Sequence, residues 1–459
     1  MKYDNILKEI KPKKEEINKC LKIANELIDF LNDSAKKEGI NAEAFLVGSV
    51  AKETFLSGKS DIDIFISFPL DVSMDYLEEK GLLLGYKASD KFNGNSYKNY
   101  ASHPYLISEI DGFKVDFVPC YKIDKGDNIK SAVDRTILHT NYIKTNKINK
   151  DEILLLKRFM SETKTYGSEN KVGGFAGYLC ELLILKYQTF ENLLLSATNW
   201  KYGTSIDLEG YGTSKQFNDP LIVIDPTDKN RNVAASLRLD TYSEFINSAR
   251  NYLESSDDIK LKYFYNLDKT LSINKLKNQF NDRGNTSYII SFKIPEIVHD
   301  ALHPQLKKTL ESICEKLEDN EFKVFKSDYW SDEENIAIFI LEMEVFKLSN
   351  IKVHYGPKIF AKKACLNFQK IHGRENCYTL NDFLVKNTER EFKTCESYIN
   401  HILTNEHSHK IKIGKNLKDS LLETYNISLL IDNMDEFNEN KDFLIFLDDF
   451  LNPGQYQRR

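Results

Sequence analysis

The stretch GSVAKETFLSGKSDIDIFI, residues 48–66, decides how the first part of the chain folds. Side chains two apart on a strand point to the same side, so Asp61 and Asp63 share one face of a strand predicted at 62–68. The alternating isoleucines form the opposite face, on which a helix can pack. The two carboxylates, about 7 Å apart by the rise of a strand, repel each other unless a cation binds them. Because hard oxygen ligands favour Mg²⁺, we predict a magnesium site here.

A third carboxylate fits the same site. In the strand predicted at 113–118, Val115 and Phe117 point to the core and Asp116 points away. If this strand pairs beside 62–68, Asp116 joins Asp61 and Asp63. Three carboxylates can hold two metal ions, one activating an attacking hydroxyl and one neutralising a triphosphate leaving group. We therefore predict that these three residues are catalytic and bind two Mg²⁺ ions.

The Gly48-Ser49 pair supplies a complementary anion site. A glycine at a strand-to-helix turn lets backbone N–H groups face an anion, and Ser49 adds a hydroxyl. Lys52 follows one helical turn later. Taken singly, a Gly-Ser pair is usually a helix cap, and an Asp-x-Asp pattern is usually a solvated strand face. Their combination with a distant strand aspartate predicts a nucleoside triphosphate site that includes Gly48, Ser49 and Lys52.

The rest of the chain predicts a multidomain α+β protein. A helix at 13–37, four strands and a hairpin turn at Asp111-Gly112 indicate a mixed first domain, residues 1–145. Helical periodicity, interrupted at 201–219, indicates a second domain, 146–268. The order strand, helix, strand, strand suggests a ferredoxin-like or RRM-like body at 269–372. A helical tail is expected at 373–459.

Composition excludes several classes of protein. The 459 residues carry 63 Lys+Arg and 69 Asp+Glu, a net charge of −6, so no basic field covers the whole chain, although a local basic groove remains compatible. No apolar run approaches the roughly 20 residues that span a membrane. We therefore expect no membrane association. The sequence shows no export signal, and its seven cysteines are scattered without a CxxC pair, so we expect reduced thiols and a cytoplasmic location. The sequence EHSH at 406–409 is interpreted as a polar loop rather than a metal site.

The motifs around the three aspartates resemble the DNA polymerase β-type nucleotidyltransferase superfamily. Their ordered set is similar to archaeal, class I CCA-adding enzymes, which are tRNA nucleotidyltransferases, and the similarity weakens after about Gly373. The resemblance implies a polymerase β-like head, a helical central domain, an RRM-like body and a tail. Several members of the family have Glu where this chain has Asp61, and Arg is common where it has Lys52, which keeps the charge and loses the bidentate fork. The quoted motifs are GSVAKET at 48–54, SDIDIF at 60–65, VDFVPCY at 115–121, DRT at 134–136, KVGGFAGYLCELL at 171–183, DPTD at 225–228, RNVAA at 231–235 and VHYGP at 353–357.

The resemblance also implies further site residues, for some of which a simpler interpretation exists. Thr136, His139, Lys157 and Tyr166 are implied to lie at the incoming triphosphate. Taken alone, Lys157 is more typical of a solvated lysine at the edge of an apolar stripe, and Tyr166 could belong to the core. Asp225 and Arg231 are implied to frame the base edge, because Arg offers donors and Asp acceptors. The alternative for this pair is a salt bridge across a loop.

The activity implied is template-independent transfer of CMP, CMP and AMP from CTP and ATP to tRNA 3′ ends, with release of pyrophosphate. The implied partner is the acceptor and T arms of tRNA, with residues 352–363 supplying basic and aromatic groups, and a homodimer is left open. Alternatives are a poly(A) polymerase, an oligoadenylate synthase or a catalytically dead RNA-binding protein. The intact set of three aspartates argues against the last of these.

Overall fold

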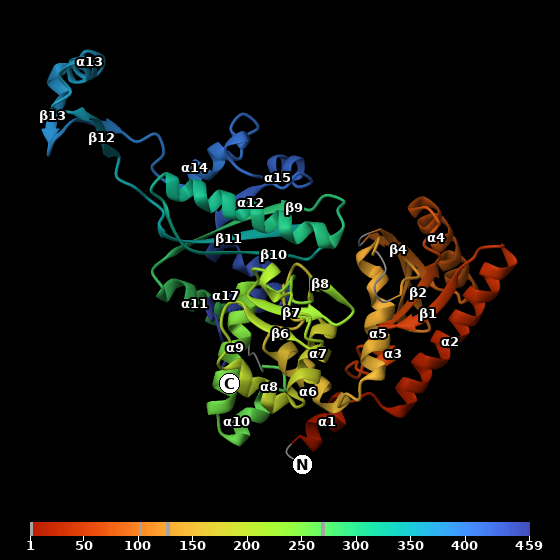
Figure 1. Cartoon of the computed structure of the whole chain (residues 1–459). Coiled ribbons are helices and arrows are strands. Elements are labelled where there is room, and N and C mark those ends of the chain that lie inside the picture. Colours follow the sequence, from red (N-terminus) through yellow and green to blue (C-terminus); the bar gives the residue numbers. More distant parts are fainter. Residues whose placement is uncertain (1–2, 101–102, 125–128, 268–270) are drawn as a thin grey trace. The chain divides into compact units, whose positions relative to one another are not determined.

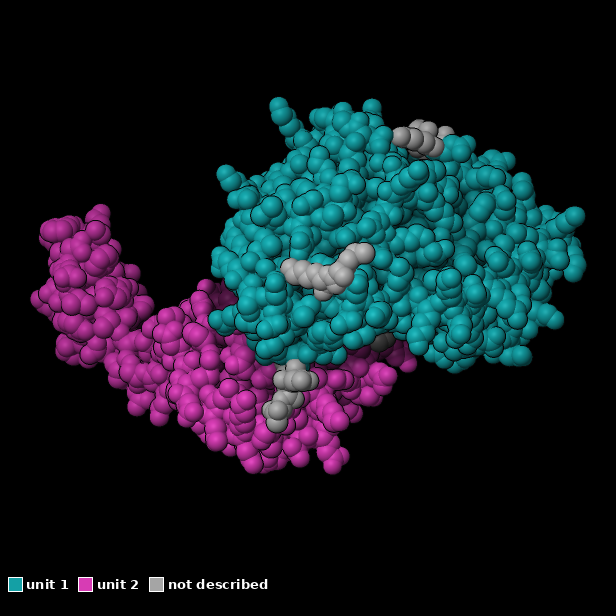
Figure 2. Space-filling view, turned by 90° about the horizontal axis from the view of Figure 1, so that it is seen from below, with its two compact units in different colours: residues 1–269, 454–459 teal, residues 270–453 magenta. Residues whose placement is uncertain are grey.

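The computed structural model describes residues 3–100, 103–124, 129–267 and 271–459 (Figure 1). Contacts divide the chain into two compact units, residues 1–269 with 454–459, and residues 270–453 (Figure 2). The predicted boundary at 268 lies at this division, whereas those at 145 and 372 fall inside the units. None of the helices in the described residues is long and apolar enough to cross a membrane.

The first unit contains a five-stranded sheet in the order β1-β2-β5-β4-β3. Strands β2 and β5 are parallel, and the other neighbouring pairs are antiparallel. Helices α2 and α4 pack their apolar residues on one face, against the isoleucines of β2. The predicted hairpin at Asp111-Gly112 is confirmed, since both residues have positive φ and join β4 to β5. The bounds are β1 Glu43–Val47, β2 Ile62–Phe68, β3 Asn95–Tyr100, β4 Pro104–Ile110, β5 Phe113–Tyr121, α2 Lys14–Lys37 and α4 Met74–Lys91.

The helical part of this unit encloses an aromatic core to which Phe159, Phe190, Phe245 and Tyr252 contribute. It also contains a three-stranded sheet, β6-β7-β8, where helices with a polar interruption were predicted. The central strand has the sequence LIVID and is buried throughout, so it lacks the alternation that would have revealed it. The bounds are α1 Asp4–Ile10, α3 Gly48–Lys52, α5 Arg135–Thr145, α6 Lys150–Glu162, α7 Gly177–Tyr187, α8 Phe190–Ala197, α9 Leu239–Glu254, α10 Asp257–Lys262, β6 Thr204–Asp207, β7 Leu221–Asp225 and β8 Asp228–Asn232.

The second unit is built on an antiparallel sheet in the order β10-β11-β9-β15. Helices α12, α14 and α15 cover one face, and α11, α16 and α17 cover the other, so this sheet lacks the open face of an RNA-binding RRM. The segment after Gly373, predicted to be helical, also contributes strands, because β15 completes this sheet. The bounds are β9 Thr286–Lys293, β10 Lys323–Ser331, β11 Ile336–Val345, β15 Asn426–Leu429, α11 Ile273–Asp282, α12 His299–Asp319, α14 Cys395–Ile402, α15 Lys418–Thr424, α16 Leu430–Asn433 and α17 Lys441–Leu451.

The same unit holds a separate three-stranded sheet, β12-β14-β13, with helix α13. A small core of Cys365, Cys377, Phe368 and Leu384 supports it. We call residues 351–389 the basic module, because exposed lysines lie on its strand β12 and helix α13. The predicted boundary at 372 passes through it, since β12 pairs with β14. The bounds are β12 Ile351–Lys358, α13 Lys362–His372, β13 Cys377–Leu380 and β14 Phe383–Glu389.

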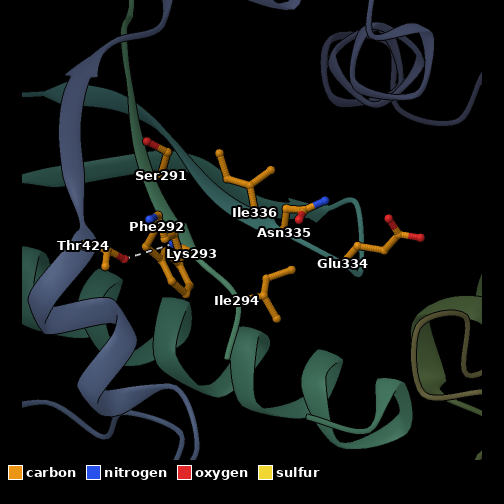
Figure 3. Close-up of a pocket in the computed structure, with 8 residues that line it drawn as sticks. All are labelled: Ser291, Phe292, Lys293, Ile294, Glu334, Asn335, Ile336 and Thr424. Carbon is orange, nitrogen blue, oxygen red and sulfur yellow. Dashed lines mark hydrogen bonds between the residues drawn. The ribbon is translucent and has the colours of Figure 1, made fainter. Parts of the chain in front are cut away.

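A cavity of about 510 Å³ lies in the second unit, beside the end of β9 and the turn into β11 (Figure 3). The backbone N–H of Lys293 donates a hydrogen bond to Thr424 at its wall, at 3.0 Å. None of the site residues predicted from the sequence lines this cavity. The lining residues are Ser291, Phe292, Lys293, Ile294, Glu334, Asn335, Ile336 and Thr424.

Candidate active site

The predicted pairing of the aspartate strands is confirmed. Strands β2 and β5 run parallel with Asp63 opposite Asp116, and Asp61 directly precedes β2. The side chains that alternate with these aspartates, among them Ile62 and Val115, are fully buried against the helices. The two paired carboxylates are half-buried and Asp61 is exposed. The alternation of the two strands therefore places the acidic groups on the face of the sheet away from α2 and α4.

Gly48, the first residue of α3, lies directly against the carboxylate of Asp63. Its φ is +72°, and a Cβ atom built on it would lie 1.9 Å from Oδ2 of Asp63. A side chain would fit there only if the Asp63 carboxylate moved, and the positive φ independently favours glycine. The strand-to-helix turn predicted at Gly48-Ser49 is present between β1 and α3 and brings bare backbone against Asp63, whereas phosphate binding by this turn stays a prediction.

Burial and the charges of neighbouring carboxylates perturb the pKa of both paired carboxyl groups. Burial, together with the charges of Asp116 and Asp61, raises the pKa of Asp63 to about 7, while Lys52 and Lys114 act in the opposite direction. Burial raises the pKa of Asp116 to about 6 against the effect of Lys114. Such shifts mark a site that is short of positive charge.

The donor chemistry of this site fits a divalent cation. Oδ1 of Asp116 is buried with no hydrogen-bond partner in the part of the chain that the structure describes, and Nζ of Lys114 lies 3.8 Å away. Hard carboxylate oxygens are suitable ligands. Among the described residues, however, no group of three or more His, Cys, Asp or Glu side chains is arranged so that it could hold a metal ion. The structure thus pairs Asp63 with Asp116, and the charge of Asp61 acts on both carboxyl groups; binding of metal by the three residues stays a prediction.

Lys52 and Lys157 meet at a buried carboxylate. Nζ of Lys52, on α3, donates to Oε2 of Glu181, on α7, at 2.6 Å, and the hydroxyl of Thr54 donates to Oε1 at 2.6 Å. Nζ of Lys157, on α6, donates to the carbonyl of Thr54 at 2.7 Å and lies 4.0 Å from Oε1 of Glu181. Lys157 is only 3% exposed, so its interpretation as a solvated lysine is wrong. Burial lowers the pKa of Lys157, and the charge of Glu181 opposes this.

Tyr166 approaches the same cluster from the loop before α7. A Cβ atom on Gly177, the first residue of α7, would lie 3.2 Å from the Tyr166 hydroxyl and 3.5 Å from Nζ of Lys157. The ring of Tyr166 packs against the aromatic core, as the simpler reading predicted. Its hydroxyl nevertheless faces the start of α7 together with Lys157, so the two readings of Tyr166 are compatible.

Asp225, at the end of β7, is fully buried and organises a second cluster. Its Oδ2 accepts hydrogen bonds from Nε2 of His139 and from Arg231, each at 2.8 Å, and its Oδ1 accepts two from Thr227. Burial acts to raise the pKa of Asp225, but these hydrogen bonds and charges hold it below its usual range. Burial lowers the pKa of His139. The salt bridge that was the alternative interpretation of this pair is therefore present, and no part of Asp225 is exposed to a ligand.

Thr136 and His139 lie one turn apart on α5. The imidazole of His139 stacks on the ring of Tyr178, with centroids 4.0 Å apart and planes at 17°. Nζ of Lys52 lies 5.9 Å from the centroid of the same tyrosine ring. Tyr178 thus connects the cluster around Glu181 to the cluster around Asp225.

Three family models match successive parts of the chain. The nucleotidyltransferase domain matches residues 25–139, the second domain of tRNA nucleotidyltransferase matches 151–265, and the C-terminal domain of CCA-adding enzyme matches 283–429. The CCA-adding enzyme of Methanothermobacter thermautotrophicus is 44% identical over 459 residues, which is 100% of this chain and 99% of the relative. The chain belongs to the CCA-adding enzyme family. Further relatives are the CCA-adding enzymes of Methanocaldococcus jannaschii, 39% identical over 84% of this chain and 87% of theirs, and Methanosarcina barkeri, 35% identical over 92% of each.

Membership of the CCA-adding enzyme family makes the chain a nucleotidyltransferase with a polymerase β-like catalytic fold. Nucleotidyltransferases of this fold generally use a divalent metal and nucleoside triphosphates. Both statements agree with the acidic pair on β2 and β5 and with the lysines beside it.

Two residues of the candidate site were not singled out from the sequence. Glu181 is a buried anion that accepts hydrogen bonds from Lys52 and Thr54, and Tyr178 stacks on His139 with its hydroxyl buried and without a hydrogen-bond partner in the described residues. A signal for Glu181 did exist. It is the one charged residue in the apolar run YLCELLIL, residues 178–185, and a charge in such a run requires a buried partner.

Proposed function

We propose that this protein transfers CMP, CMP and AMP, in that order and without a template, from CTP and ATP to the 3′ ends of tRNA. The observation that carries the proposal is the similarity to CCA-adding enzymes along the whole chain. In each step, the tRNA 3′-oxygen forms a bond to the α-phosphorus while the bond from that phosphorus to the bridging oxygen breaks, and pyrophosphate leaves. Positioning and charge neutralisation are the main contributions a protein makes to such a reaction.

Asp61, Asp63 and Asp116 would hold two Mg²⁺ ions. When bound, the metal would favour ionisation of the attacking 3′-hydroxyl and offset charge on the leaving pyrophosphate. The raised pKa values of Asp63 and Asp116 support this assignment, because a cation would relieve the repulsion that causes part of the shift. The exposed position of Asp61 leaves it free to turn toward a bound ion.

The triphosphate would bind between the turn at Gly48-Ser49 and the cluster of Lys52, Lys157 and Tyr166, with Thr136 and His139 alongside. Arg231 would present its remaining N–H groups to the base edge. Asp225 is buried, so we assign it a different role from the direct base contact implied by the resemblance: it orients Arg231 and His139. Discrimination then rests on the arginine donors together with the RNA end.

The basic module would grip the acceptor and T arms of tRNA. In this module Tyr355 is 57% exposed and Phe360 is 85% exposed. Three exposed lysines lie close to them in sequence: Lys358, Lys362 and Lys363. Exposed aromatic rings can stack on unpaired bases, and lysines can contact phosphates. The covered faces of the β9–β11 sheet make it a poorer candidate for this contact.

Incubating the full-length protein with tRNA that lacks its CCA end, one nucleotide at a time, tests the proposal. CTP alone should add two residues, and ATP should add one residue only after the two cytidines. A poly(A) polymerase would instead add a run of A to the same RNA, and an oligoadenylate synthase would join ATP without tRNA. The variant Asp63→Ala should be inactive with both nucleotides, which separates true transfer from a contaminating enzyme.

A further inference from the structure

We propose that Glu181 is a positioning residue for the triphosphate: its buried carboxylate holds the ammonium groups of Lys52 and Lys157 so that both act on one phosphate chain. The inference rests on the proposed function, because it assumes that these lysines contact a nucleoside triphosphate. Glu181 itself does not contact the substrate.

The first argument is that both oxygens of the Glu181 carboxylate are hydrogen-bonded. Glu181 is 1% exposed, and both of its oxygens accept short hydrogen bonds, one from Lys52 and one from Thr54. Lys52 is 8% exposed. Lysine side chains are among the most mobile in proteins, and buried ion pairs with good geometry restrict them. Glu181, on a helix 129 residues further along the chain, therefore fixes the position of the Lys52 ammonium group.

The second argument is charge balance. Two ammonium groups share the Glu181 carboxylate, so these three side chains alone carry one more positive than negative charge, and the charge of Lys52 also acts on Asp63. A buried charge without a partner is costly, and in a nucleotidyltransferase the triphosphate is the anion that would balance it. Without Glu181 the same buried cluster would hold two neighbouring ammonium groups, which repel each other and would move apart or lose a proton.

The third argument is alignment along α7. Gly177 and Glu181 are four residues apart and so lie on one face of this helix. The Tyr166 hydroxyl and Nζ of Lys157 approach Gly177, while Lys52 and Thr54 approach Glu181. One helix face thus gathers groups from α3, from α6 and from the loop before α7. Glu181 joins the aspartate-bearing domain to the helical part at the place where both supply cations.

The test measures CMP and AMP incorporation by the full-length protein at saturating tRNA. In Glu181→Gln we expect the KM for CTP and for ATP to rise about tenfold or more, by equal factors, with a smaller change in kcat. Equal factors are expected because the phosphates are common to both substrates. Glu181→Asp keeps the charge and should recover part of the loss despite its shorter side chain, whereas a role in shape alone would make the isosteric glutamine the milder change.

Glu342 provides a matched control for the loss of a buried ion pair. It is fully buried in the second unit and accepts hydrogen bonds from Arg283 at 2.5 and 3.0 Å and from Asn285. Glu342→Gln should lower the melting temperature as Glu181→Gln does, but leave the KM for both nucleotides unchanged. If Glu181→Gln does not fold, Thr54→Val, which removes one donor and keeps every charge, should still raise both KM values severalfold.

The outcomes separate this inference from the proposed function. A wild-type protein that incorporates neither CMP nor AMP would refute the proposed function. An active wild type whose Glu181→Gln variant keeps its KM values would refute the positioning role alone. A lowered KM would also refute it, because it would show that Glu181 competes with the triphosphate for the lysines.

Discussion

The contact between Gly48 and Asp63 makes a quantitative prediction for Gly48→Ala. The new Cβ would lie 1.9 Å from Oδ2 of Asp63, whereas Cβ contacts under 3.0 Å essentially never occur, so the carboxylate must move by about 1 Å. A misplacement of about 1 Å in an active site can reduce the rate by about 100-fold, or about 2.7 kcal/mol of transition-state stabilisation. Alanine in the left-handed region adds about 1–2 kcal/mol of strain to the folded state. We expect this loss of single-turnover CMP and AMP transfer, with folding retained.

Gly39→Ala is the matched control for the strain of placing alanine at a positive φ. Gly39 has a φ of +66°, close to the +72° of Gly48, but a Cβ there would meet nothing within 4 Å. Urea denaturation should show similar destabilisation of both variants, while Gly39→Ala keeps wild-type turnover. The reasoning would be refuted if Gly48→Ala kept more than half of the wild-type rate, or if Gly39→Ala lost activity to the same extent.

Three further predictions concern protons, bases and RNA. Burial and the neighbouring carboxylates raise the pKa of Asp63 from 3.8 to about 7, so the folded state binds this proton more tightly than the unfolded state does. Without divalent metal, the melting temperature should therefore fall as the pH rises from about 4 through 7. The variant Asp63→Asn should show a smaller fall over the same pH range. Arg231→Ala should weaken discrimination among nucleotides by about 1–3 kcal/mol, and unchanged inhibition by tripolyphosphate would show that the triphosphate site is intact. Changing Lys362-Lys363 to glutamates should weaken tRNA binding, and the slope of log affinity against log salt concentration should become shallower by about 0.9 for each lost phosphate contact. The exposed pair Lys36-Lys37 on α2 is the control. Equal losses of affinity from both pairs would contradict a specific RNA surface.

Local patterns account for the parts of the fold that could be predicted. Alternation in 62–68 predicted β2 with the bounds observed, and Asp111-Gly112 predicted the turn into β5. Elements without a local pattern were missed. Strand β3, NSYKNY, is a polar edge strand, and β8, DKNRN, reads as a loop. Both become strands because neighbours in space supply hydrogen bonds, which sequence spacing does not encode.

The candidate site divides in the same way. The pairing of Asp63 with Asp116 follows from two local alternations and one assumption about which strands are neighbours. The burial of Lys157 does not follow from its spacing, because the partners that make burial tolerable come from 103 residues away at Thr54 and from Glu181 on another helix. Charged clusters held by tertiary contacts are therefore where sequence reasoning was weakest, and where the family resemblance added most.

Buried hydrogen bonds and ion pairs form part of the contact between the aspartate-bearing sheet and the helical part. The sheet and the helices have separate principal apolar cores, and between them stand buried polar links: Lys52 to Glu181, Lys157 to Thr54 and His139 to Asp225. Apolar surfaces tolerate small sliding movements, but a buried ion pair that separates leaves its charges uncompensated. These links therefore hold the carboxylates and the cations in one register. A triphosphate, with about four negative charges, would bind to cations that are already oriented. Little of its binding energy would then be needed to arrange these cations.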